Sequence, residues 1–140
     1  MLAFQETMQL GFWKTKFSEL NAMTTFTRTL LSGSTSGREI PVAATATPGT
    51  LLHTAVAGAL AFDEIYLWAS NVTNAVASLT IEWGASGTVG DHLVDTYSIP
   101  PNSAPIPIAT GQNLNGGLAV RAFSGTASAI NISGYVNRIQ

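Results

Sequence analysis

The chain has 140 residues, of which 46% are hydrophobic and only 10% are charged, and its net charge is -2. The length favours a single domain, while ordinary soluble domains carry roughly 25% charged residues. The few Lys and Arg residues are scattered, which argues against nucleic-acid binding because that depends on clustered positive charge. The chain contains no cysteine, so it can form neither disulfides nor thiolate metal sites. A surface this poor in charge predicts a subunit that associates with partners.

The first residues, Met1 to Ala22, differ from the Thr-, Ser-, Ala-, Val- and Gly-rich remainder of the chain. They are not typical of a signal peptide, because Glu6 stands where basic residues belong and polar residues interrupt any apolar core. No apolar run reaches the roughly 20 residues of a membrane helix, so we expect no membrane association. We predict an N-terminal docking arm over residues 1–24 and a β-sandwich domain over residues 25–140. Met23 stays open as an alternative start.

Written as a helix, the arm has apolar side chains on two nearly opposite faces, whereas a helix on the surface of its own domain needs only one. Gly11 weakens a continuous helix, and an extended form with one apolar face is the alternative. The two apolar faces of the helical form predict that the arm is buried between two surfaces. The predicted interface residues of the arm are Phe4, Met8, Phe12, Trp13, Phe17 and Leu20.

From about Thr25 onward, short β-rich runs alternate with turn residues. The runs cover residues 26–31, 38–44, 50–57, 63–71, 78–83, 92–99, 105–110, 118–123 and 129–137. Their spacing of roughly 10 to 15 residues is typical of a sandwich or barrel, and no interval holds a helical pattern long enough for a parallel crossover. We therefore predict an all-β fold, an antiparallel β-sandwich that is jelly-roll-like or Ig-like, with about eight strands.

Residues 33–49 are poor in large apolar side chains and are predicted to be an extended connection. Residues 25–49 as a whole are predicted to be partly extended and open to exchange with a neighbouring copy. Within residues 78–83, alternation places Thr80 and Glu82 on the face opposite the core.

Residues 63–71 show the same alternation, with two aromatic side chains on the face opposite the core. Ile65 and Leu67 point toward the core, whereas Tyr66 and Trp68 point away from it. Large aromatic side chains in such a position need a cover, which is either another element of this chain or a neighbouring subunit. We predict Tyr66 and Trp68 to be interface residues.

No pattern in the chain predicts a catalytic, cofactor or metal site. The "GSTSG" stretch has Thr35 where a nucleophile elbow needs serine. Asp91 and His92 are adjacent, so on a strand they point to opposite faces and do not form a metal site. His53 is predicted to be a strand histidine that is hydrogen-bonded to a neighbour, and Asp63 to be solvated or paired with an arginine. We expect no cofactor and no enzymatic activity.

Three phrases of the chain resemble small β-sandwich structural proteins of tailed-bacteriophage virions, most closely capsid decoration (cement) proteins. They are "TRTLLSGSTSGREIPVAATATPGTLLHTAV", "DEIYLWASN" and "GLAVRAFSGTASAINISGYVNRI", and the resemblance covers Thr25 to Ile139. It implies a homotrimer, assembled in the host cytoplasm, that binds the major capsid protein on the capsid surface. The alternatives are a tail, baseplate or head-fibre subunit, or a carbohydrate-binding module that stacks sugars on exposed aromatic rings.

Overall fold

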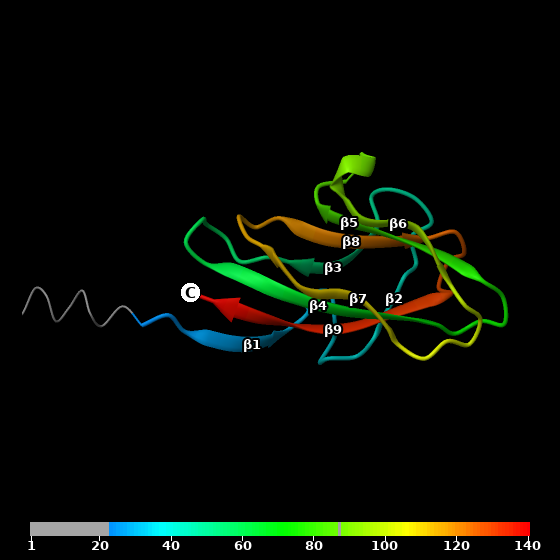
Figure 1. Cartoon of the computed structure of the whole chain (residues 1–140), viewed down its shortest axis with the longest axis horizontal. Coiled ribbons are helices and arrows are strands. Elements are labelled where there is room, and N and C mark those ends of the chain that lie inside the picture. Colours follow the sequence, from blue (N-terminus) through cyan, green and yellow to red (C-terminus); the bar gives the residue numbers. More distant parts are fainter. Residues whose placement is uncertain (1–22, 87) are drawn as a thin grey trace, which may run out of the picture.

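The computed structural model describes residues 23–86 and 88–140, which form two antiparallel sheets packed against each other (Figure 1). The predicted all-β sandwich is therefore confirmed. Most of the predicted docking arm, residues 1–22, lies outside the described residues. The same holds for its predicted interface residues, Phe4, Met8, Phe12, Trp13, Phe17 and Leu20.

The five-stranded sheet has the order β1-β9-β4-β7, and the short β2 also pairs with β9. The four-stranded sheet has the order β3-β8-β5-β6. The first sheet comprises β1 (Phe26–Leu30), β2 (Ile40–Pro41), β4 (Phe62–Asn71), β7 (Ile106–Leu114) and β9 (Ile130–Ile139). The second comprises β3 (Thr50–Thr54), β5 (Ala77–Gly84), β6 (His92–Ile99) and β8 (Ala119–Ser124), with a 3-10 turn, η1 (Val89–Asp91), before β6.

Each predicted run overlaps one strand, and the number of strands among the described residues exceeds the expected eight because two residues of the run 38–44 pair as β2. The edge strand β7 also continues to Leu114, beyond the predicted end at Thr110, because β4 pairs with it along its length.

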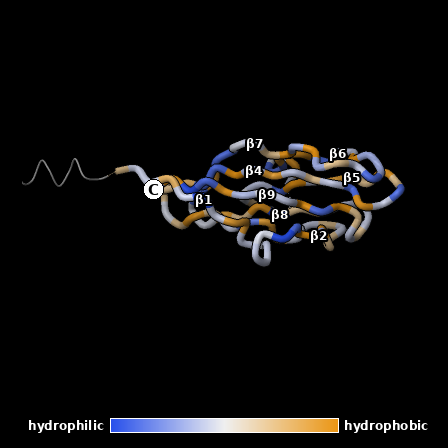
Figure 2. Tube along the Cα trace, turned by 90° about the horizontal axis from the view of Figure 1, so that it is seen from below, coloured by the Kyte–Doolittle hydropathy of each residue, from blue (hydrophilic) through white to orange (hydrophobic). Residues whose placement is uncertain are grey.

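The core lies between the sheets and follows the period-two alternation of the strands. Ile65 and Leu67 of β4 are completely buried, and hydrophobic and paler segments alternate along β4 and β9 in Figure 2. Gly134 of β9 lies directly opposite Leu67, and a Cβ there would come within 2.1 Å of the Tyr66 carbonyl oxygen. Only glycine lets these two central strands approach so closely.

Residues 33–49 are fastened to the sandwich of their own chain. The Gly33 N–H donates to the Leu52 carbonyl oxygen at 3.0 Å, β2 pairs with β9, and Val42 is fully buried in the core. Exchange of residues 25–49 with a neighbouring copy stays a prediction.

The outward side of β5 is covered, which the sequence analysis did not anticipate. Glu82 is completely buried, and its Oε2 accepts a hydrogen bond from the Gly49 N–H at 2.8 Å. Arg121 donates to the Gly49 carbonyl oxygen at 3.2 Å from the neighbouring strand β8. The chain entering β3 therefore crosses this part of the four-stranded sheet, and a side chain expected to face solvent is enclosed.

Candidate interaction surface

The outer surface of the five-stranded sheet carries a row of aromatic rings. The Tyr66 and Tyr135 rings are stacked, with centroids 5.0 Å apart and an interplanar angle of 16°. Trp68 lies 5.9 Å from the Tyr135 ring, and the Arg28 guanidinium lies 4.2 Å from the centre of the same ring. Since Arg28 is on β1, Tyr135 on β9 and Tyr66 on β4, the strand order places the Tyr135 ring between the other two side chains.

The register of the strands and one glycine determine where these aromatic rings lie. Tyr135 is the direct cross-strand partner of both Tyr66 and Leu30, and direct partners share a face of the sheet. Gly111 of β7 lies under the Tyr66 hydroxyl oxygen, which would be only 2.9 Å from a Cβ at that position, and its φ is +103°. A larger residue at 111 would be strained and would displace the ring.

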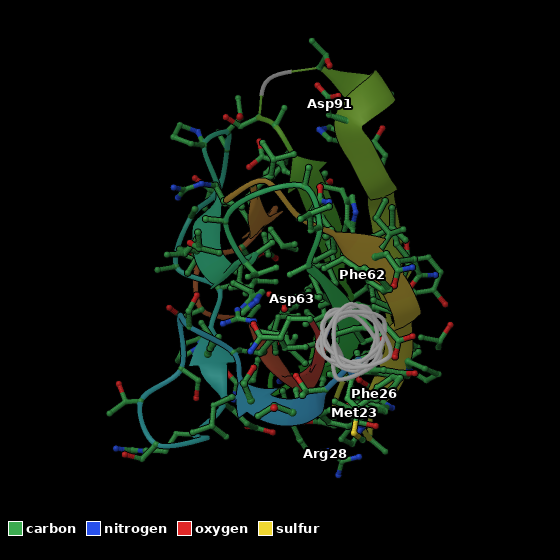
Figure 3. The ribbon with its side chains drawn as sticks, turned by 90° about the vertical axis from the view of Figure 1, so that its left-hand side faces the viewer. Met23, Phe26, Arg28, Phe62, Asp63 and Asp91 are labelled. Atoms are coloured by element: carbon green, nitrogen blue, oxygen red, sulfur yellow. The ribbon has the colours of Figure 1, made fainter. Side chains whose placement is uncertain are left out.

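Beyond a polar row formed by Arg28, Asn137 and Glu64, apolar side chains occur again at the end of the sheet where β1 begins. Ile139 is the cross-strand partner of both Phe26 and Phe62, so the three form one row. Phe26 is 71% exposed and Leu30 is 55% exposed. Figure 3 shows Met23, Phe26 and Arg28 together at one corner of the molecule. We call this surface the aromatic face; its members are Phe26, Leu30, Phe62, Tyr66, Trp68 and Tyr135.

A charged cluster lies between the two sheets at the same end. Asp63 of β4 is completely buried, and the Arg138 Nε and a terminal guanidinium nitrogen donate to its two oxygens at 2.8 and 2.9 Å. The His53 Nε2 and the Val56 N–H each lie 2.9 Å from Asp63 Oδ2. The cluster joins β3 of one sheet to β4 and β9 of the other.

The contacts of His53 assign its tautomer and its role. Its Nδ1 accepts a hydrogen bond from the Ser32 N–H at 3.1 Å, so the proton is on Nε2, which donates to Asp63. Both ring nitrogens are therefore used within the fold, and the ring is 2% exposed. Burial alone raises the pKa of Asp63, but hydrogen bonds from Arg138, His53 and Val56, with the positive charge of Arg138, hold this pKa below its ordinary value. The hydrogen bond to Asp63 raises the pKa of Arg138.

At this end of the sheet, charged side chains point toward the interior and apolar side chains point outward, which is the reverse of the usual distribution. Asp63 and Arg138 point inward, while their chain neighbours Phe62 and Ile139 lie in the outward row with Phe26. Burying charged groups requires complete hydrogen bonding, and the cluster supplies it. The described chain leaves Phe26 without an equivalent cover.

The two predicted interface residues of the domain, Tyr66 and Trp68, lie outside the core and are half-buried. Tyr135 covers part of both rings, so one of the two expected covers is an element of this chain. No local sequence pattern marks Tyr135, Arg28 and Phe26 as residues of the same surface. Pairing β1 and β4 with β9 in antiparallel register would have found them.

Other candidate sites have a simpler geometry. His92 Nδ1 lies 3.3 Å from Asp95 Oδ1, and no group of three or more metal-binding side chains occurs within residues 23–86 and 88–140. A shallow hollow beside Phe62 is lined by Asn113, Leu114 and Asn115. Among the described residues, no helix has the length and apolar character needed to cross a bilayer.

Comparison with protein-family models, curated proteins and solved structures gives no match for this chain.

Proposed function

We propose that this chain is a non-enzymatic structural protein of a tailed-bacteriophage virion, which binds the capsid surface and stabilises contacts between capsomers, as a homotrimer. The observation that carries the proposal is the aromatic face, where Phe26 and Leu30 are exposed on a small domain with few charges. Exposed large apolar side chains gathered on one face of a domain favour a site of association. The resemblance of residues 25–139 to decoration proteins supplies the virion and the major capsid protein as partner.

The symmetry of a capsid shell favours association through surfaces of this kind. A single weak contact becomes effective when it is repeated across a symmetric assembly. A domain whose free surface is apolar on one side fits such a role better than it fits a freely diffusing monomer.

The direct test is the copy number of this chain in purified particles, measured by quantitative mass spectrometry against the major capsid protein. A decoration protein is expected at an abundance similar to that of the capsid protein. A few copies per particle would instead assign the chain to the tail, baseplate or head fibre. Absence from particles would overturn the virion proposal.

Carbohydrate binding is the weaker proposal, because a sugar stacks on a free ring face. Tyr135 has Tyr66 on one side and Arg28 on the other, so its faces are occupied. Binding to a glycan array that is lost in the Trp68→Ala variant would nevertheless favour the carbohydrate alternative.

A further inference from the structure

The exposed end of the aromatic face coincides with the point where the first residues of the chain join the domain. Met23, Phe26 and Leu30 are 78%, 71% and 55% exposed, within one stretch of eight residues. They lie on or just before β1, which among residues 23–86 and 88–140 is an edge strand paired on one side only. Edge strands with exposed apolar side chains readily pair with another chain.

The reversed side chains strengthen this observation. Phe62 and Ile139 would fit the core, yet Asp63 and Arg138 occupy the inward positions beside them. The register of β1, β4 and β9 therefore places Phe26, Ile139 and Phe62 on the outer side of the sheet. Turning these strands over to bury the three side chains would bury charged side chains at other positions of the same strands.

The described chain enters the domain at the end of the aromatic face that carries Phe26. Thr25 and Gln140 exchange backbone hydrogen bonds, at 2.6 Å and 3.2 Å, so the β1–β9 ladder extends to the last residue of the chain. Met23, two residues earlier, is 78% exposed beyond the end of this ladder. Residues 1–22 are therefore joined to the domain beside the exposed apolar side chains, where a second copy of the chain can reach them.

The sequence of residues 1–22 fits a surface of this kind. It carries large apolar side chains and only four charged ones, Glu6, Lys14, Lys16 and Glu19. As a helix, 22 residues extend about 33 Å, and the ten residues of β4 span a similar ~33 Å. The segment is thus long enough to cover the aromatic face from end to end.

We infer that the aromatic face of one copy binds residues 1–22 of a second copy of this chain. The inference goes beyond the proposed function, because it concerns free chains in solution and holds wherever the protein is located. Its failure is also distinguishable from failure of that proposal, since one is measured on purified protein and the other on particles.

The chain lacks cysteine, so single cysteines can be introduced to test the contact. An equimolar mixture of Gln9→Cys and Asn137→Cys, one of them carrying a mass tag, is treated with a short bismaleimide. Asn137 lies on the aromatic face as the partner of Arg28 and Glu64. We expect a cross-linked heterodimer between Gln9→Cys and Asn137→Cys. The matched control Val89→Cys is 71% exposed on η1 and is expected to give none.

The double variant Gln9→Cys/Asn137→Cys, diluted and cross-linked, distinguishes binding between copies from binding within one chain. A purely intramolecular link would overturn the inference, as would equal cross-linking of Asn137→Cys and Val89→Cys.

Sedimentation equilibrium of the full chain gives an independent measurement. Phe26→Ser is expected to raise the dissociation constant of self-association at least about tenfold, and Val89→Ser is expected to leave it unchanged. A wild-type chain that stays monomeric throughout, or a Phe26→Ser variant that associates normally, would overturn the inference. Far-ultraviolet circular dichroism verifies that each variant retains its sheets.

Discussion

The two ends of β4 place opposite kinds of side chain in the interior. Near its beginning, Asp63 points inward and Phe62 outward; near its other end, Ala69 is buried in the core and Ser70 lies on the outward side. The second arrangement is that of an ordinary sandwich strand. The first is stable only because the charged cluster satisfies Asp63, and it places apolar side chains where a partner can reach them. The two ends of one strand thus combine an interior held by hydrogen-bonded charges with an interior held by apolar packing.

The largest expected loss of stability comes from removing the Asp63 carboxylate, which is the acceptor at the centre of the charged cluster. Asp63→Ala leaves Arg138 and His53 without their acceptor, and we expect the free energy of unfolding to fall by about 3 kcal/mol. Urea denaturation followed by circular dichroism measures this. The control Glu39→Ala removes an exposed carboxylate that accepts from Asn131, and a change below about 0.5 kcal/mol is expected. Equal losses of unfolding free energy in the two variants would contradict the comparison between the two ends of β4.

The same cluster predicts a dependence of stability on pH. The pKa of Asp63 is lowered in the folded protein, so its contribution is fully present above its unfolded pKa of about 3.9. The contribution is lost as the pH falls from there through the folded pKa. The stability difference between the wild type and Asp63→Asn should therefore be constant near neutral pH and should narrow below about pH 4. Denaturation curves from pH 7 to pH 2 measure it, and a constant difference throughout would contradict the assignment.

A smaller effect is expected for the contact between Arg28 and Tyr135 on the outward side. A double-mutant cycle with Arg28→Ala and Tyr135→Leu should give a coupling energy of about 0.5 to 1 kcal/mol, typical of an exposed cation–π pair. The same cycle with Arg38→Ala provides a distant control, with an expected coupling near zero. A coupling as large as the effect of Asp63→Ala would mean that the outer row stabilises the fold as much as the interior cluster does.

The smallest effect on stability is expected for Phe26→Ser in dilute, monomeric protein. Because the side chain is largely exposed, the free energy of unfolding should change by about 0.5 kcal/mol or less. The side chain would then matter for association and little for folding. A loss of several kcal/mol would show instead that Phe26 belongs to the fold, and the comparison of the two ends would lose its functional meaning.

The sequence was sufficient for the strands and for the inward alternation of β4, since period-two patterns and turn residues are local signals. It was insufficient for Glu82, because the cover comes from Gly49, 33 positions earlier in the chain. It also missed the partnership of Tyr66 with Tyr135, which depends on the register between β4 and β9. Asp63 was expected to be solvated or paired with an arginine, and Arg138 is that arginine. Its burial follows from the position of β3 in the opposite sheet, which no local pattern encodes.

The stacking of Tyr66 on Tyr135 also gives this surface an optical signature. Two aromatic chromophores 5.0 Å apart couple their electronic transitions, and Trp68 lies close enough to accept excitation from Tyr135. Near-ultraviolet circular dichroism and indole emission should therefore report on this surface without an added label. Gly111, on a different strand, sets the angle of the coupled pair through the Tyr66 hydroxyl. A Gly111→Ala variant would accordingly alter the spectrum of the unliganded protein before any partner is added.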